Sequence, residues 1–377
     1  LMADYEKVND VAAGSTEKVN NVAKSNIEKI NDMTTPSSGA TYWITAMNAR
    51  DIAFAASSDT TSWTNYDAGI NPPGASVNPL SLGYGQDNSN NPLYVITNAT
   101  DNGEMMRAPN AADSQTTWTA IQNDYRLFDV AYGNGVWVAV GQMTGSSPKG
   151  NNVFRSTDGG TNWSSVDVSG ATDIENTGCY AIVYSGLNTS DGGIFYFAQR
   201  QRIFKSSDGG ATWDLAHTLV DSGGSDPGDI RALQVTNSSL VAFIKSAGEL
   251  FSCSLSDDTD WSTETSLTQA SGISLNTNMA SGGGRVVLVQ SQKFWAADVS
   301  GKSITLEHDN ADLSSDTHGN AISVGTDGSG TFIVGCTDGD ILKSTDNADS
   351  FSKQGGDPGA GASLKCVAMI GNVLLPV

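Results

Sequence analysis

Short apolar runs alternate with polar turns along most of the chain, in a pattern that predicts antiparallel hairpins. The clearest case is "LFDVAYGNGVWVAVGQ" at 127–142, where an Asn-Gly step separates two apolar runs. Asparagine and glycine tolerate the positive φ that tight hairpin turns need. Similar runs recur at 230–246, 275–291 and 321–337. We expect each segment to form the inner strand pair of a sheet, with "SGGGR" at 281–285 as a hairpin turn.

A second pattern predicts outer hairpins. "VFRSTDGGTNWSSV" at 153–166, "IFKSSDGGATWDL" at 203–215 and "ILKSTDNADSFSK" at 341–353 each carry S-x-D-x-x-x-x-[WF] after two apolar residues and a basic one. A single copy looks like a binding site, but recurrence favours a structural role. The aspartate would accept backbone N–H bonds, glycine would permit the turn, and the aromatic ring would pack over it. The residues concerned are Ser156, Asp158, Gly160, Trp163, Ser206, Asp208, Gly210, Trp213, Ser344, Asp346 and Phe351.

The spacing of these copies predicts a propeller. Asp158 and Asp208 are 50 positions apart, and Asp346 follows Asp208 by 138 positions, which is three steps of 46. About seven copies at a period of roughly 40–50 residues are typical of propeller blades. The weaker copies needed to complete the series lie at 52–66, 105–121, 250–263 and 293–307.

The two ends of this region complement each other. The segment 364–377 resembles an inner strand pair without an outer pair, and 49–66 an outer pair without an inner one. Joining them in one blade would remove two exposed sheet edges. We therefore expect an all-β fold: a seven-bladed β-propeller over 42–377, closed by N- and C-terminal strands in one blade.

A different repeat precedes the propeller, with a period of 11 residues over "YEKVNDVAAGS", "TEKVNNVAKSN" and "IEKINDM". Such a period suits a right-handed helical supercoil, whereas the Asn-Asp and Asn-Asn steps suit an extended ladder with turns. Both interpretations stay open. We expect an attachment arm at 1–35 and a linker at 36–41. The attachment candidates are Val8, Asn9, Val11, Val19, Asn20, Val22, Ile27, Ile30, Asn31 and Met33.

Charge and composition exclude several functions. The net charge of -21 repels nucleic-acid phosphates and anionic lipid, so we expect no nucleic-acid partner. We also expect no membrane insertion, because no run approaches about 18 apolar residues. The N-terminus lacks the pattern of a secretion signal, which favours synthesis in a cytosol. The four widely spaced cysteines, Cys179, Cys253, Cys336 and Cys366, are expected to be buried free thiols.

The S-x-D-x-G-x-x-W pattern resembles the Asp-box, or BNR repeat, of propellers of the sialidase, sortilin and photosystem-assembly-factor type. The match is strong at Asp158/Trp163 and Asp208/Trp213 and fair at Asp346/Phe351. In that family the box fastens the outer strands of a blade and lies far from any active site. The resemblance therefore implies a structural role for these residues.

The N-terminal repeat resembles the "K-[VI]-N-G-V" repeats of virion structural proteins of marine phages, cyanophages included. Asp10, Asn21 and Asp32 stand where those repeats have glycine. The resemblance implies a phage virion protein that is assembled in the host cytoplasm. It would dock to other virion proteins through residues 1–35, be present as a homo-oligomer or in multiple copies, and display its propeller to a host surface glycan or protein as a tail or fibre appendage. A capsid-decoration protein and a glycan-binding or glycan-hydrolysing propeller of the sialidase-like type are the alternatives.

Candidate catalytic residues are not evident, and we expect no enzyme and no cofactor. A sialidase needs three arginines on the substrate carboxylate and a Tyr/Glu nucleophile pair, but the chain has few arginines and lacks the F-R-I-P motif. His217, His308 and His318 show no metal-ligand spacing. Weak Ca²⁺ binding in two other aspartate-rich segments, at 254–260 and 337–342, is the remaining option, with solvated turn carboxylates as the alternative.

Overall fold

A computed structural model describes most of the predicted propeller and a small part of the arm. The chain divides into two compact units, Leu1–Thr41 and Tyr42–Val377. The described residues are 18–19, 22–23, 42–47, 51–56, 60–67, 79–98, 105–109, 119–121, 125–143, 152–175, 177–186, 193–236, 238–271, 273, 278–355 and 364–370.

In the first unit, β1 (Lys18–Val19) pairs antiparallel with β2 (Val22–Ala23). Val19 faces Val22 in this register. The repeat is therefore extended at these four positions, as in the ladder interpretation. The other attachment candidates lie outside the described residues: Val8, Asn9, Val11, Asn20, Ile27, Ile30, Asn31 and Met33.

The second unit consists of antiparallel sheets of four strands, with a fifth strand in one of them. In the described part of the chain we find no helical segment with the length and apolar character that crossing a bilayer requires. The sheets, each in spatial order, are β31 (Leu364–Ile370), β3 (Tyr42–Met47), β4 (Asp51–Ala56), β5 (Trp63–Asp67); β6 (Pro79–Gln86), β7 (Pro92–Asn98), β8 (Met105–Pro109), β9 (Thr119–Ile121); β10 (Tyr125–Gly133), β11 (Val136–Met143), β12 (Val153–Ser156), β13 (Ser164–Val166); β14 (Ala181–Tyr184), β15 (Phe195–Gln199), β16 (Arg202–Ser206), β17 (Asp214–Thr218); β18 (Ile230–Thr236), β19 (Ser239–Ile244), β20 (Glu249–Ser254), β21 (Asp257–Trp261), with β22 (Thr265–Ser266) on β20; β23 (Met279–Gly282), β24 (Arg285–Gln290), β25 (Lys293–Ser300), β26 (Ser303–Asp312); and β27 (Ala321–Thr326), β28 (Phe332–Cys336), β29 (Ile341–Ser344), β30 (Ser352–Lys353).

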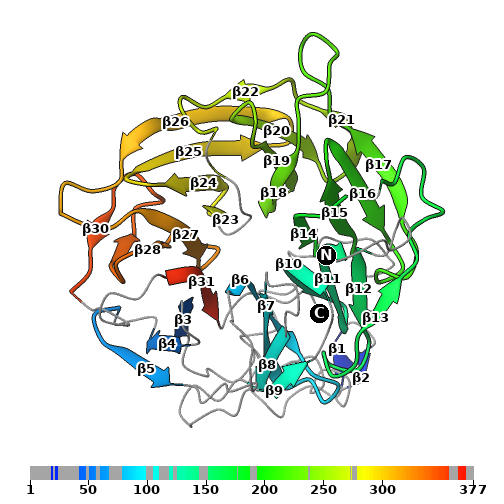
Figure 1. The fold of residues 1–377 in the computed structure, drawn as a ribbon, viewed down its shortest axis with the longest axis horizontal. Helices are drawn as coiled ribbons and strands as arrows, with labels where there is room; N and C mark the ends of the chain where they lie inside the picture. The colour runs from blue at the N-terminus through cyan, green and yellow to red at the C-terminus, as the bar shows by residue number, and fades with distance from the viewer. Residues whose placement is uncertain are drawn as a thin grey trace. The chain divides into compact units, whose positions relative to one another are not determined.

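The first strands of these sheets contact one another in a closed circle. The sequence of contacts is β6, β10, β14, β18, β23, β27, β31 and back to β6. Figure 1 shows these strands nearest the centre, with the later strands of each sheet farther out. This arrangement confirms the prediction of an all-β β-propeller.

One sheet joins the two ends of the propeller, but not with the predicted division of strands. The C-terminal segment supplies only β31, and β3 takes the second position through a register from Tyr42↔Ile370 to Met47↔Leu364. The expected inner pair at 364–377 is therefore wrong: residues 371–377 lie outside the described part, and the second strand comes from the N-terminal side. The apolar run "YWITAM" at 42–47 is the strand that the repeat spacing left out.

The predicted inner hairpins and their turns are present. Asn134 and Gly135, between β10 and β11, have φ of 48° and 77°. Gly283 and Gly284, in the "SGGGR" turn between β23 and β24, have φ of 59° and 82°. These left-handed conformations are those that asparagine and glycine adopt at low cost.

The position of a strand within its sheet determines its burial. Every residue of β15, β19 and β28 is buried, because these second strands are covered on both faces by neighbouring sheets. The outermost strand β26 instead alternates between exposed and half-buried residues. Tyr196 of β15 and Ala242 of β19 belong to one buried cluster, so the core lies between successive sheets.

Tyrosines close the gaps between the first strands at one end. A Cβ atom on Gly85 would lie 2.2 Å from Cγ of Tyr132, and one on Gly133 would lie 2.3 Å from Cδ2 of Tyr184. Only glycine therefore lets the ring of the next sheet lie against the strand at these two places. In the sequence, the two glycines that make this contact belong to the Tyr-Gly dipeptides at 84–85 and 132–133.

Three cysteines, Cys179, Cys253 and Cys336, are free and buried, and the side chain of Cys366 lies outside the described residues. Burial raises the pKa of Cys253 to about 12. These thiols therefore stay protonated at neutral pH and contribute to packing.

Candidate functional site

The three strong copies of the aspartate pattern form hairpin loops with one hydrogen-bond geometry; we call residues 156–163, 206–213 and 344–351 the acidic loops. In the first, Asp158 Oδ1 accepts hydrogen bonds from the backbone N–H groups of Thr161 (3.1 Å) and Asn162 (2.8 Å). The Ser156 hydroxyl donates to the same oxygen at 2.8 Å and accepts from Gly160 N–H at 3.0 Å. The serine and the aspartate together hold the turn.

The other two acidic loops repeat this arrangement. Asp208 Oδ1 accepts from the backbone N–H groups of Ala211 and Thr212 at 3.0 and 2.9 Å, and Asp346 Oδ1 accepts from Ser350 N–H at 3.1 Å. Ser206 donates to Asp208 at 2.8 Å, and Ser344 donates to Asp346 at 2.7 Å. Gly210 N–H and Ala348 N–H bond to these serine hydroxyls.

In the first two acidic loops, the indole N–H of a tryptophan donates a hydrogen bond to the carbonyl three residues before it. The Nε1–H of Trp163 donates to Gly160 O at 3.0 Å, and that of Trp213 to Gly210 O at 3.1 Å. Phe351, which has no N–H group, is 8% exposed and packs in the third loop. Two weaker copies keep the tryptophan bond: Trp63 donates to Thr60 O and Trp261 to Asp258 O, both at 2.8 Å.

Hydrogen bonding keeps the loop carboxylates ionised. Partial burial raises the pKa of Asp158, but hydrogen bonds from Asn162, Ser156 and Thr161 outweigh it and hold the pKa below its ordinary value. The same balance lowers the pKa of Asp208 and of Asp346. An ionised carboxylate that accepts several N–H bonds stabilises its turn.

The basic residue of the pattern reaches across to the next sheet. Three such residues, each on the third strand of a sheet, donate hydrogen bonds to the outer hairpin of the following sheet. The partners are 53 or 54 residues apart, which is one repeat. The acidic loops are thus parts of the joints between sheets, which is the structural role. The pairs are Arg107 with Thr161, Arg155 with Gly209, and Lys205 with Asp258.

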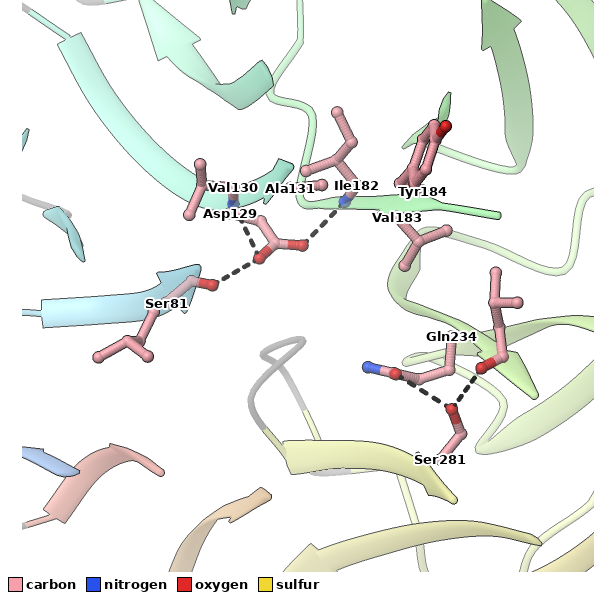
Figure 2. Close-up of a pocket in the computed structure, with 11 residues that line it drawn as sticks. Ser81, Asp129, Val130, Ala131, Ile182, Val183, Tyr184, Gln234 and Ser281 are labelled. Atoms are coloured by element: carbon pink, nitrogen blue, oxygen red, sulfur yellow. Dashed lines mark hydrogen bonds between the residues drawn. The ribbon is translucent and has the colours of Figure 1, made fainter. Parts of the chain in front are cut away.

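A cavity of about 330 Å³ lies among the first strands and is the better candidate for a binding site. Five consecutive first strands wall it: β6, β10, β14, β18 and β23. Figure 2 shows two groups of polar side chains that project into this space from opposite sides. Its polar lining residues are Ser81, Asp129, Tyr184, Gln234 and Ser281.

Asp129 dominates the first polar group. Its side chain is 2% exposed, and a buried carboxylate needs hydrogen-bond donors to remain charged. Oδ1 accepts from the Ser81 hydroxyl at 2.6 Å and from Val130 N–H at 3.0 Å, and Oδ2 accepts from Ile182 N–H at 2.8 Å. Three successive sheets therefore hold this carboxylate in one orientation.

Gln234 and Ser281 form the second polar group. The Ser281 hydroxyl lies 2.7 Å from Val235 O and 3.5 Å from Gln234 Oε1. Its single hydrogen belongs to the closer acceptor, so Gln234 Oε1 receives little from it. Gln234 Nε2 donates to Met279 O at 3.0 Å. An amide nitrogen has two hydrogens, and the second has no acceptor among the described residues.

A stacked cluster lies near the cavity residues, with Phe128 on β10, Tyr180 just before β14 and Arg231 on β18. The rings of Phe128 and Tyr180 are 5.0 Å apart and nearly parallel, at 13°. The guanidinium carbon of Arg231 lies 3.5 Å from the Tyr180 ring centroid. Phe128 and Arg231 are the residues at which β10 and β18 bulge. The bulges place these three side chains next to one another on consecutive sheets.

The arginines that a sialidase would need are engaged elsewhere. Besides the links between sheets, the described ion pairs of the arginines use carboxylates that do not line the cavity, and the described lining of the cavity contains no arginine. Arg50 lies outside the described residues. The ion pairs are Arg200 and Arg202 with Glu175, Arg231 with Asp229, and Arg285 with Asp298 and Asp349.

Each of the two loops proposed for weak Ca²⁺ binding holds a carboxylate in an ion pair with a lysine. Asp258 lies 2.9 Å from Lys205 Nζ, and Asp340 lies 2.7 Å from Lys353 Nζ. Within the described ranges, no group of three or more His, Cys, Asp or Glu side chains is arranged to hold a metal ion.

Local sequence motifs gave no sign of the cavity residues. Ser81 and Asp129 lie about one repeat apart and Asp129 and Gln234 about two repeats apart, each on a different first strand, and no short motif joins them. The available signal is a polar residue inside an otherwise apolar first strand, as in "LFDVAYG" and "IRALQVT".

No protein-family model and no curated protein sequence matches the chain. Several solved structures share its fold. YCF48 from Cyanidioschyzon merolae is 15% identical, with a TM-score of 0.55 over 78% of this chain and 89% of that chain. A Bacteroides uniformis protein provisionally named a 6-phosphogluconolactonase is 11% identical, with a TM-score of 0.59 over 88% and 99%. Virginiamycin B lyase from Staphylococcus aureus is 15% identical, with a TM-score of 0.50 over 74% and 85%. At these identities the likeness establishes a β-propeller and no activity.

Proposed function

We propose that the chain is a non-enzymatic structural protein of a phage particle, an appendage of the tail or fibre type. The arm at 1–35 docks it to other virion proteins, and the propeller is displayed for recognition of a host surface glycan or protein. The observation that carries the proposal is the combination of the 11-residue repeat with a propeller in one chain. The protein is assembled in the host cytoplasm and is present in several copies on the particle.

We also propose that the sheets form one ring of seven blades and that the acidic loops are Asp-boxes. The circle of first strands from β6 to β31 supports the count. The paired serine and aspartate hydrogen bonds at Asp158, Asp208 and Asp346 support the second assignment. Hydrogen bonds between the sheets make such a ring rigid, which suits display of loops outside a cell.

The cavity supports binding more than catalysis. Glycoside hydrolysis uses a pair of carboxylates about 5–9.5 Å apart, whereas Asp129 is the one carboxylate in the described lining. Its oxygens accept hydrogen bonds from Ser81, Val130 and Ile182. A glycan hydrolase remains the competing function, and release of reducing sugar from host polysaccharide by the purified protein would establish it instead.

The docking role is tested with the arm alone. Residues 1–35 fused to a fluorescent carrier should co-sediment with particles that lack the protein. A matched fusion with Val19 and Val22 changed to aspartate should remain in the supernatant, because the apolar positions of the repeat would then carry charge. Equal sedimentation of both fusions, or of neither, would contradict the role. Immunogold labelling of whole particles then separates a tail or fibre location from capsid decoration.

A further inference from the structure

We propose that the cavity among the first strands binds one neutral sugar ring. The inference deepens the proposed recognition function and rests on it for the source of the ligand, a host surface glycan. Size restricts the ligand first. A volume of about 330 Å³ lies at the lower end of small-molecule sites, which span about 300–1,000 Å³. The space suits a single ring.

Charge restricts the ligand second. Asp129 is the one carboxylate of the described lining, and no lysine, arginine or histidine lies among the residues that border the cavity. The Asp129 carboxylate lies in the cavity wall, and the net charge of -21 repels anions from the molecule as a whole. The site therefore disfavours anionic sugars such as uronates and sialates.

The polar groups match a polyol. Each sugar hydroxyl can donate one hydrogen bond and accept others, so it needs both kinds of partner. On one wall, Asp129 is 2% exposed and its oxygens already accept hydrogen bonds from Ile182 N–H and the Ser81 hydroxyl, so only a narrow edge of the carboxylate can accept from a ligand. Gln234, on the other wall, supplies an N–H and an oxygen from one amide (Figure 2). Hydroxyls on opposite sides of one ring can reach both walls.

Apolar groups complete the site. Val130 and Val183 line the same cavity, and the Val183 side chain points into it (Figure 2). A sugar ring has a face of C–H groups that packs against aliphatic side chains. A ligand would thus meet an apolar surface between the two polar walls.

The experiment measures binding of defined sugars to the full chain by saturation-transfer NMR and calorimetry. The probes are D-glucose, D-galactose, D-mannose and N-acetyl-D-glucosamine, with D-glucuronate as the charged counterpart of glucose and N-acetylneuraminate as a second anion. We expect at least one neutral sugar to bind, and the anionic sugars to bind at least tenfold more weakly. Absence of binding by every neutral sugar, or equal binding of glucose and glucuronate, overturns the proposal.

Variants locate the site. Gln234→Leu removes the amide with little change in volume and should lower the affinity for the sugar at least tenfold. Val183→Trp fills the cavity and should abolish binding. Gln354→Leu makes the same chemical change after β30 and should leave the affinity unchanged. Thermal melting checks that each variant is folded. Unchanged affinity in folded Gln234→Leu and Val183→Trp proteins overturns the site.

Failure of this inference and failure of the proposed function give different results. If the protein is found in purified particles but neutral sugars do not bind the cavity, the virion role stands and the ligand is wrong. If the cavity binds a neutral sugar and the protein is absent from particles, the site stands and the virion role is wrong. Gln234→Leu particles that lose adsorption to host cells support both.

Discussion

The Nε–H of Arg155 donates a 2.6 Å hydrogen bond to the backbone carbonyl of Gly209. Arg155 lies on β12, and Gly209 lies in the acidic loop of the following sheet. A charge-assisted bond between elements 54 residues apart ties two sheets together at their outer strands. The pattern "basic residue, Ser-x-Asp" therefore describes both halves of a joint: the cation of one repeat and the loop of the next.

Replacement of Arg155 by methionine should loosen this joint. The methionine side chain keeps most of the apolar stem of arginine but has no hydrogen-bond donor. A hydrogen bond to a charged group is worth about 1.5–3 kcal/mol. We expect the free energy of unfolding, measured by urea denaturation, to fall within that range. Lys343→Met is the matched control, because Lys343 occupies the same position in the last copy and its side chain donates no hydrogen bond to the described residues of the following sheet. Equal losses in both variants would refute the joint.

Replacement of Asp158 by alanine should destabilise the first acidic loop. Thr161 N–H, Asn162 N–H and the Ser156 hydroxyl would lose their acceptor. We expect a loss of about 1–3 kcal/mol in the free energy of unfolding, because the loop loses hydrogen bonds to a charged acceptor. Asp167→Ala, at an exposed carboxylate after β13, is the control. Sugar binding of folded Asp158→Ala protein should be unchanged, and a loss of binding would show that the loop has a role beyond structure.

Stability should decline in acid because of the loop carboxylates. Their folded pKa values lie below the ordinary value of 3.8, so the folded state binds fewer protons than the unfolded chain near that pH. The stabilisation is present above pH 3.8 and is lost as the pH falls through the folded values. A triple variant, Asp158→Asn with Asp208→Asn and Asp346→Asn, should melt lower at pH 7 and lose less on acidification. Parallel curves of melting temperature against pH would contradict this.

Strand β31 closes the ring, and its removal should prevent folding. It pairs with β3 and contacts β6 and β27, so its loss exposes the edge of β3 and the surfaces of β6 and β27 that pack against it. We expect a chain ending at residue 363 to aggregate, and a synthetic peptide of 364–377 to restore soluble protein when added during refolding. A soluble truncated chain with an unchanged melting temperature would show that closure does not depend on β31.

The repeat spacing predicted the propeller and the hairpins because each blade repeats the same local pattern. The spacing could not show how the two ends of the chain share the closing sheet. One C-terminal strand with three N-terminal strands makes a sheet of four strands, and so do two strands from each end. The composition of Tyr42–Met47 was the missing clue. The bulges at Phe128 and Arg231 were beyond prediction, since an extra residue in a first strand leaves the apolar pattern intact.

The cavity residues were missed for a related physical reason. Asp129 becomes notable only when Ser81 and Ile182 of neighbouring sheets supply its donors, and these contacts span about one repeat of sequence. The acidic loops, by contrast, have all of their carboxylate bonds within four residues. The sequence pattern therefore revealed the acidic loops, whose contacts are local, but not the cavity, whose contacts join residues far apart in the chain.

The most direct test of the virion role is quantitative mass spectrometry of gradient-purified phage particles from lysates that contain this protein. The account predicts that the chain co-purifies with the major capsid protein at a fixed ratio across gradient fractions, and that deletion of residues 1–35 moves it to the soluble fraction. A chain that remains in the soluble fraction at full length, with no fixed ratio to capsid protein, would contradict it.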